Sequence, residues 1–220
     1  MKQKYSHIIW DWNGTLFDDV AWCIKCMNIM LVKRKLPPIQ DILAYHDVFC
    51  FPVIQYYKNI GFDLHLESFE ELAREFIALY HSNNSGNCKL HSNTEKVLAD
   101  ICSYGVTQCI LSASEMSLLQ SQMSEFCIGG YFDEVLGLSD IYAKSKVDIG
   151  LDYMARKNTT NALLIGDTIH DYEVATALGV DCVLIPSGHQ SREKLLICDV
   201  PILDDISHIV EYIDNPAEKV

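Results

Sequence analysis

Five short apolar runs constrain the fold of this chain more than any other feature. They span residues 7–10, 107–112, 131–138, 161–167 and 181–186, and Gly, Ser or Asp ends or closely follows each one. Runs of this length are typical of strands that are buried on both faces of a sheet. Helical apolar patterns separate the later runs. This strand–helix alternation predicts an α/β fold with a doubly wound parallel sheet.

Four helical patterns alternate with the later apolar runs, at residues 93–105, 114–126, 145–157 and 171–179. Gly105 and Gly179 stand where the first and last of these helices should end. We expect Ser114 to cap the second helix, and Ser145 to form a capping box with Asp148 at the start of the third.

The interval from residue 17 to residue 86 has a different pattern. Its apolar residues follow helical spacing, no good strand interrupts them, and the polar segment "SNNSGN" (82–87) closes it. We therefore expect a core domain made of residues 1–16 and 87–220, and a helical domain of residues 17–86 inserted after the first strand. Gly86 and Asn87 are plausible hinge points about which this insert would move as a lid.

The composition excludes some classes of partner. The chain has 220 residues, of which 49% are hydrophobic, and its 17 basic and 30 acidic side chains give a net charge of -13. This charge argues against binding to nucleic acid or to an anionic membrane surface. The sequence has no stretch that predicts a signal peptide or a membrane span. Nine cysteines, including Cys23 and Cys26 in a helical pattern, are expected to be free thiols of a cytoplasmic protein.

Polar side chains recur where the predicted strands end. Asp11, Ser112 and Asp167 close three strands, and Lys144 and Lys146 open the helix that follows another. Ligands of open parallel sheets bind at the carboxyl ends of the strands, so these groups should meet at one edge. Each residue alone has a simpler explanation as a cap or surface residue. Together, two buried carboxylates call for a cation, most simply Mg²⁺.

Four segments of the sequence resemble the motifs of the haloacid-dehalogenase-like (HAD) superfamily. They are "DWNGT", "ILSAS", the lysine at 144 or 146, and "GDTIHD". The helical insert resembles the C1 cap of that family, and "GDTIHDYEVATALGV" is most similar to phosphoglycolate-phosphatase-like hydrolases. The resemblance implies a Rossmann-like core with a helical cap, and hydrolysis of a small phosphorylated metabolite.

The resemblance also implies a mechanism and a metal site. Asp11 would be the nucleophile that forms an aspartyl-phosphate. Mg²⁺ would bind the Asp11 carboxylate, the backbone carbonyl of Asn13, and Asp167, and Asp171 would act from the outer shell. We therefore take Asp11, Asn13, Asp167 and Asp171 as the candidate metal-site residues.

The second and third motifs would hold the phosphoryl group. Ser112 and the lysine would contact its oxygens and balance the charge that develops on them. Lys146 is the preferred lysine because it follows the expected N-cap Ser145 and would be tethered to the first helical turn. Lys144 is the alternative.

Asn13 departs from the pattern of the family's phosphatases, which usually have Asp at this position to protonate the leaving oxygen and later activate water. An amide can do neither. The chain is then a specialised or slow phosphatase, in which water or His170 supplies the proton, or a phosphate-ester-binding or regulatory protein without turnover. Dehalogenation or phosphoryl transfer to an acceptor is a third interpretation. The sequence also leaves open whether Asn13 is natural or engineered. The sequence leaves the substrate and the choice between monomer and dimer undetermined.

Overall fold

A five-stranded parallel sheet forms the centre of the protein. The computed structural model describes residues 4–82, 88–138 and 145–214. The strands lie in the order β5-β4-β1-β6-β7, and every neighbouring pair is parallel. Their bounds are β1 His7–Trp10, β4 Thr107–Glu115, β5 Glu134–Leu138, β6 Ala162–Gly166 and β7 Asp181–Leu184. The five predicted strands and the doubly wound α/β class are confirmed.

Helices cover both faces of this sheet. The core cluster on one face includes residues of α5 (Thr94–Ser103), α6 (Met116–Ser124) and α10 (His208–Asp214). The cluster on the other face includes residues of α7 (Lys146–Lys157), α8 (Ile169–Leu178) and α9 (Arg192–Leu195). Two short 3₁₀ turns complete these layers, η1 Gly129–Tyr131 and η2 Leu196–Cys198. No helix in the described part of the chain has the length and apolar character needed to cross a membrane.

The helix ends agree with the sequence at α7 and differ from it at α6. Ser145 and Asp148 form the expected capping box. Ser114 does not cap α6, because β4 continues through a register irregularity as far as Glu115, and Glu115 occupies the N-cap position without a side-chain cap bond. The Ser114 hydroxyl donates instead to Asn13 Oδ1 at 2.6 Å. The expectation for Ser114 was wrong because tertiary contacts extend the strand past the local capping signal.

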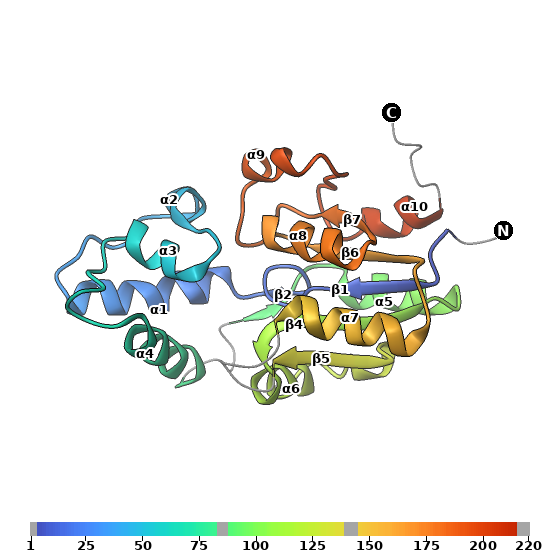
Figure 1. Ribbon diagram of the computed structural model, residues 1–220, viewed down its shortest axis with the longest axis horizontal. Coiled ribbons are helices and arrows are strands. Elements are labelled where there is room, and N and C mark those ends of the chain that lie inside the picture. The colour runs from blue at the N-terminus through green and yellow to red at the C-terminus, as the bar shows by residue number, and fades with distance from the viewer. Residues whose placement is uncertain (1–3, 83–87, 139–144, 215–220) are drawn as a thin grey trace.

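Four helices lie between β1 and the rest of the sheet in sequence. They are α1 Val20–Lys33, α2 Ile42–Val48, α3 Val53–Asn59 and α4 Phe69–Ser82. Figure 1 shows them together at one end of the sheet, the end toward which the arrows of β1 and β5 point. A pair of two-residue antiparallel strands, β2 Phe17–Asp18 and β3 Lys89–Leu90, flanks the insert in sequence. The expectation that residues 17–86 contain only helices was wrong at β2, which is too short to leave a periodic signal.

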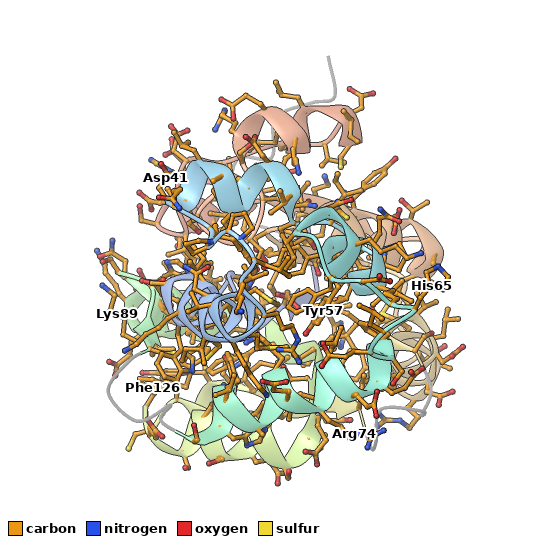
Figure 2. All side chains as sticks on the ribbon, turned by 90° about the vertical axis from the view of Figure 1, so that its left-hand side faces the viewer. Asp41, Tyr57, His65, Arg74, Lys89 and Phe126 are labelled. Atoms are coloured by element: carbon orange, nitrogen blue, oxygen red, sulfur yellow. The ribbon has the colours of Figure 1, made fainter. Side chains whose placement is uncertain are left out.

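These four helices have a hydrophobic core of their own. Its buried residues come from all four helices and their connections, and none of them is in the two clusters of the sheet. Figure 2 views the protein from this side and shows Tyr57 near the middle of the view, with Arg74 of α4 toward its edge. The separate core supports the division that we propose, a cap of residues 17–86 on a core of 1–16 and 87–220. The expected hinge residues Gly86 and Asn87 lie outside the described residues.

Candidate active site

The chain turns sharply where β1 ends. The Asp11 N–H donates to the carbonyl of Ile165 at 2.9 Å, so the nucleophile candidate is still tied to β6. Gly14 has φ +79°, and any Cβ there would overlap the Asp167 carboxylate and the His189 ring. Glycine is therefore required both by backbone conformation and by space. The turn brings the first motif directly against the end of β6.

Three buried aspartates meet at this edge of the sheet. Asp11, Asp167 and Asp171 are 8%, 0% and 2% exposed, and they offer oxygen atoms that all lie within 4.8 Å of one another. Carboxylates this close are unfavourable without a compensating cation. Carboxylate oxygens are also the ligands that Mg²⁺ prefers, so the donor set fits a magnesium ion.

Lys146 lies between two of these carboxylates. Its ammonium is 2.5 Å from Asp11 Oδ1 and 2.6 Å from Asp171 Oδ1, and the residue is only 4% exposed. Burial lowers the pKa of this lysine, but the two carboxylates raise it above its usual value, so the ammonium stays charged. The structure thus brings Lys146 to Asp11, while the alternative, Lys144, lies outside the described residues.

Asp171 serves the helix and the site at once. With Thr168 it forms a capping box at the start of α8, and its Oδ2 accepts the Thr168 hydroxyl at 2.6 Å. Burial raises its pKa, but the charge and hydrogen bond of Lys146 and the bond from Thr168 outweigh burial and lower it. Both oxygens are therefore engaged by protein groups, as expected of a residue in the outer shell of a metal site.

Asp167 has weaker compensation. Its oxygens accept the Thr15 hydroxyl at 2.9 Å and the backbone N–H of His189 at 2.6 Å. Burial raises its pKa to about 8; the charge of His189 opposes this, while Asp11 and Asp171 add to it. A bound cation would reverse the effect of these neighbours and keep the carboxylate ionised.

The pKa of Asp11 is raised less, to about 6. Burial is the main cause, the charge of Asp171 adds to it, and Lys146 opposes both. At neutral pH Asp11 is therefore mostly an anion, which is the state required of a nucleophile.

The amide of Asn13 is held in one orientation. Its Nδ2 donates to Asp19 Oδ2 at 2.8 Å and to the hydroxyl of Tyr80 at 3.3 Å, while its Oδ1 accepts from Ser114. The hydrogen-bond pattern suits an amide, because a carboxylate could not donate to Asp19. The position is thus built into a network that joins the core to α1 and α4.

The sequence analysis did not identify the partners of Asn13 in this network, Asp19 and Tyr80, nor His189 beyond them. His189, from the loop after β7, has Nδ1 hydrogen-bonded to the hydroxyl of Tyr45 at 2.7 Å and Nε2 3.3 Å from Asp19 Oδ1. Burial lowers the pKa of His189, but its bond to Asp19 and the charge of Asp19 raise it to about 9. No spacing in the sequence singled out His189 or Asp19.

Ser112 and His170 line the same cavity of about 170 Å³ as the three aspartates. Ser112 is 1% exposed, and its Oγ accepts the N–H of Ser114 at 3.0 Å. The His170 ring stacks on Phe51 with centroids 4.6 Å apart. Burial, followed by the charge of Lys146, lowers the pKa of His170, so at neutral pH this ring is a better proton acceptor than donor.

Comparison with known proteins finds relatives with two different names. A tyrosine-protein kinase PtkA of Mycobacterium tuberculosis is 26% identical over 185 residues, which are 83% of this chain and 62% of that protein. The chain therefore spans less than two thirds of the length of that relative. A phosphoglycolate phosphatase of Caulobacter vibrioides is 24% identical over 190 residues, with 83% of this chain and 79% of that protein covered.

Solved structures share the fold. The PtkA structure from Mycobacterium tuberculosis superposes with a TM-score of 0.81 at 23% identity, covering 97% of this chain and 99% of that one. A predicted phosphatase from Clostridium acetobutylicum gives a TM-score of 0.80 at 18% identity, covering 95% and 98%. The family model described as haloacid dehalogenase-like hydrolase matches residues 8–185. The chain therefore belongs to the haloacid dehalogenase-like hydrolases.

Proposed function

We propose that this protein is a Mg²⁺-dependent phosphatase that hydrolyses a phosphate monoester through an aspartyl-phosphate on Asp11. One observation carries the proposal: a buried Asp11 lies beside Lys146 and Asp167 in a cavity at the carboxyl edge of the sheet. Family membership and the relative named as a phosphoglycolate phosphatase support it.

The first step is attack of an Asp11 oxygen on phosphorus. The new O–P bond forms as the bond from phosphorus to the ester oxygen breaks, and that oxygen leaves with the electron pair. Lys146 and Ser112 would contact the phosphoryl oxygens and offset their charge. Mg²⁺, held by Asp11, Asp167 and the backbone carbonyl of Asn13, would supply further charge compensation.

The second step is attack of water on the aspartyl-phosphate. The water oxygen bonds to phosphorus, the bond to the Asp11 oxygen breaks, and the carboxylate and inorganic phosphate are released. The attacking water must lose a proton, and the amide of Asn13 cannot accept it. His170 is the candidate acceptor, because it lines the same cavity and burial favours its neutral form.

Removal of Asp167 should weaken metal binding. We expect calorimetry to find one Mg²⁺ per wild-type chain, and an affinity about 10–100-fold lower, or undetectable, for Asp167→Asn. The matched control is Asp63→Asn, an exposed aspartate in the cap, which should bind Mg²⁺ as the wild type does. A wild type that binds no Mg²⁺ at millimolar concentration would contradict the proposed metal site.

Phosphoryl transfer to an acceptor is a second candidate function. Two observations favour it: position 13 has no base to activate water, and one relative is named a tyrosine-protein kinase. If breakdown of the aspartyl-phosphate is slow, mixing with 4-nitrophenyl phosphate should give a burst of about one nitrophenolate per active site. Stopped-flow absorbance would measure it.

The fate of the phosphoryl group then separates the candidates. Release as inorganic phosphate supports the phosphatase, and transfer to an added alcohol or phenol supports the transferase. Asn13→Asp should remove the burst by accelerating breakdown. A linear time course for the wild type would mean that breakdown is not the slow step, and binding of phosphate analogues without turnover would favour a regulatory protein.

A further inference from the structure

A second cavity, of about 380 Å³, opens between the cap helices and the edge of the sheet. Its size lies within the usual range for small-molecule sites. This cavity adjoins the cavity around Asp11, because five residues line both: Asn13, Phe49, Ala113, Ser114 and His189. A phosphate ester bound at Asp11 would therefore extend its ester group into this second cavity.

The wall of this cavity is mostly aromatic and aliphatic. Aromatic side chains come from α2, α3 and α4 and from the α2–α3 connection, and aliphatic or thioether side chains come from α1, α3, α4, α6 and β5. They include Tyr45, Phe49, Tyr56, Tyr57, Phe76 and Ile77. Such a wall favours an apolar group, and the aromatic faces favour a flat ring.

The charges on the wall point the same way. Among the described lining residues there is no Lys or Arg, whereas two carboxylates, Asp19 and Glu115, are present. Asp19 is buried and bonded to Tyr80 and Asn13, and Glu115 is exposed. The wall also carries His189, whose imidazolium is already paired with Asp19 at 3.3 Å. A leaving group with its own carboxylate would therefore meet acidic groups and lose hydration without a Lys or Arg to pair with.

Asn13 lies at the junction of the two cavities, where the ester oxygen would lie. Its amide hydrogens already bond to Asp19 and Tyr80, and an amide has no acidic proton to give. An alkoxide leaves poorly without a proton, whereas a phenolate leaves as a stable anion. The apolar wall of the cavity and the lack of a proton donor at Asn13 therefore each favour an ester with an aromatic leaving group.

We propose that the substrate is an aryl phosphate whose uncharged aromatic group occupies the cap cavity. This rests on the proposed phosphatase function. As the Asp11–phosphorus bond forms, the bond from phosphorus to the aryl oxygen breaks, and the phenolate leaves with the electron pair and takes its proton from solvent. The aryl group could belong to a small molecule or to a phosphotyrosyl peptide, which share this chemistry.

The test compares phenyl, 2-naphthyl and 4-carboxyphenyl phosphate with glycolate phosphate, all with Mg²⁺. The first two phenols ionise at similar pH, so the comparison reports on binding of the ring. We expect kcat/KM to be about tenfold higher for 2-naphthyl than for phenyl phosphate. The 4-carboxyphenyl ester should be about tenfold worse than phenyl, and glycolate phosphate the poorest substrate.

A substitution in the cavity wall tests whether the wall causes the preference for 2-naphthyl over phenyl phosphate. Ile77→Gln replaces a lining residue of α4 that is 40% exposed, and Ile29→Gln replaces an isoleucine of α1 that is 45% exposed and does not line the cavity. Ile77→Gln should lower the naphthyl-to-phenyl ratio by about fivefold, and Ile29→Gln should leave it unchanged. Equal ratios in both variants would overturn the assignment of the cavity.

The outcomes separate this inference from the proposed function. No turnover of any ester, including 4-nitrophenyl phosphate, would defeat the phosphatase itself. Turnover with glycolate phosphate preferred, or with no gain from the larger ring, would leave the phosphatase and overturn the aryl assignment. A phosphotyrosyl peptide hydrolysed at least as well as phenyl phosphate would identify a peptide source, and turnover of phenyl phosphate without turnover of the peptide would identify a small molecule.

Discussion

Asp11→Asn should abolish turnover of every phosphate ester, with a loss of about 10⁴-fold or more in kcat. The amide is nearly the same size as the carboxylate but cannot form the aspartyl-phosphate. The loss should not depend on the leaving group, because the nucleophile is needed whichever oxygen departs. Steady-state assays with an aryl and an alkyl phosphate would measure it.

Stability provides the control for this variant. Burial raises the pKa of Asp11 in the folded protein above the value of 3.8 for a free aspartate. Between pH 3.8 and about 6 the folded state therefore binds more protons than the unfolded state. The free energy of unfolding falls as pH rises through this interval. The amide of the Asp11→Asn variant would not titrate, so thermal melting at pH 7 should occur at or above the wild-type temperature, apart from the weakened contact with Lys146.

Retained activity in a well-folded Asp11→Asn protein would contradict the nucleophile assignment. A residual rate of a few per cent that disappears after careful removal of wild-type protein would not contradict this assignment. Mass spectrometry after acid quenching adds a direct measurement, because the wild type should carry one additional phosphoryl group and the variant none.

The sheet was predictable because β1, β4, β6 and β7 carry short apolar runs that are buried on both faces, while the edge strand β5 is only partly buried. All five strands start within three residues of the predicted positions, and the largest disagreements are the start of β5 at Glu134 and the end of β4 at Glu115. The pair β2 and β3 was not predictable. Two residues per strand leave no period, and the pairing joins segments about seventy positions apart in the sequence.

The first layer of the site was predictable for a different reason. Parallel strands place their carboxyl ends at one edge, so Asp11, Ser112 and Asp167 had to lie near one another once the sheet was correct. Lys146 followed from the capping signal of Ser145. The metal and catalytic roles assigned to these residues stay predictions, since geometry alone tests only their proximity.

The surroundings of Asn13 were not predictable. Asp19, Tyr80 and His189 come from the cap and from the loop after β7, and only the packing of the cap on the core brings them together. The aromatic cavity has the same origin. Helical periodicity identifies which residues of the cap are apolar, but it does not reveal which of them face the cap's own core and which face the active site.

Asn13→Asp should raise kcat on alkyl phosphates by about 10²–10⁴-fold, the usual contribution of general acid–base catalysis. It should change kcat/KM for 4-nitrophenyl phosphate by less than about tenfold, because nitrophenolate leaves without a proton and kcat/KM does not include the later breakdown of the aspartyl-phosphate. The neighbour of position 13, Asp19, gives a further reason to expect this result. Asn13 Nδ2 is 2.8 Å from Asp19 Oδ2, so a carboxyl group placed there would lie against a carboxylate.

Two carboxyl groups at this distance share one proton, and one of their pKa values rises. Burial raises the pKa of Asp19, but the charge and bond of His189 and the bonds of Tyr80 and Asn13 lower it overall. Asp19 should therefore stay ionised and the new carboxyl should hold the proton, which is the state required of a general acid. Asn161→Asp adds a carboxyl group at an exposed site before β6 and should change neither rate.

The dependence on the leaving group decides between explanations. A plot of log kcat/KM against leaving-group pKa should be steep for the wild type and much flatter for Asn13→Asp, because only the variant protonates the departing oxygen. Equal slopes would mean that another group, such as Tyr80 or a bound water, already donates the proton. A fall in both rates with unchanged Mg²⁺ binding would mean that the new carboxylate repels the phosphate, and that the amide at position 13 is required for substrate binding.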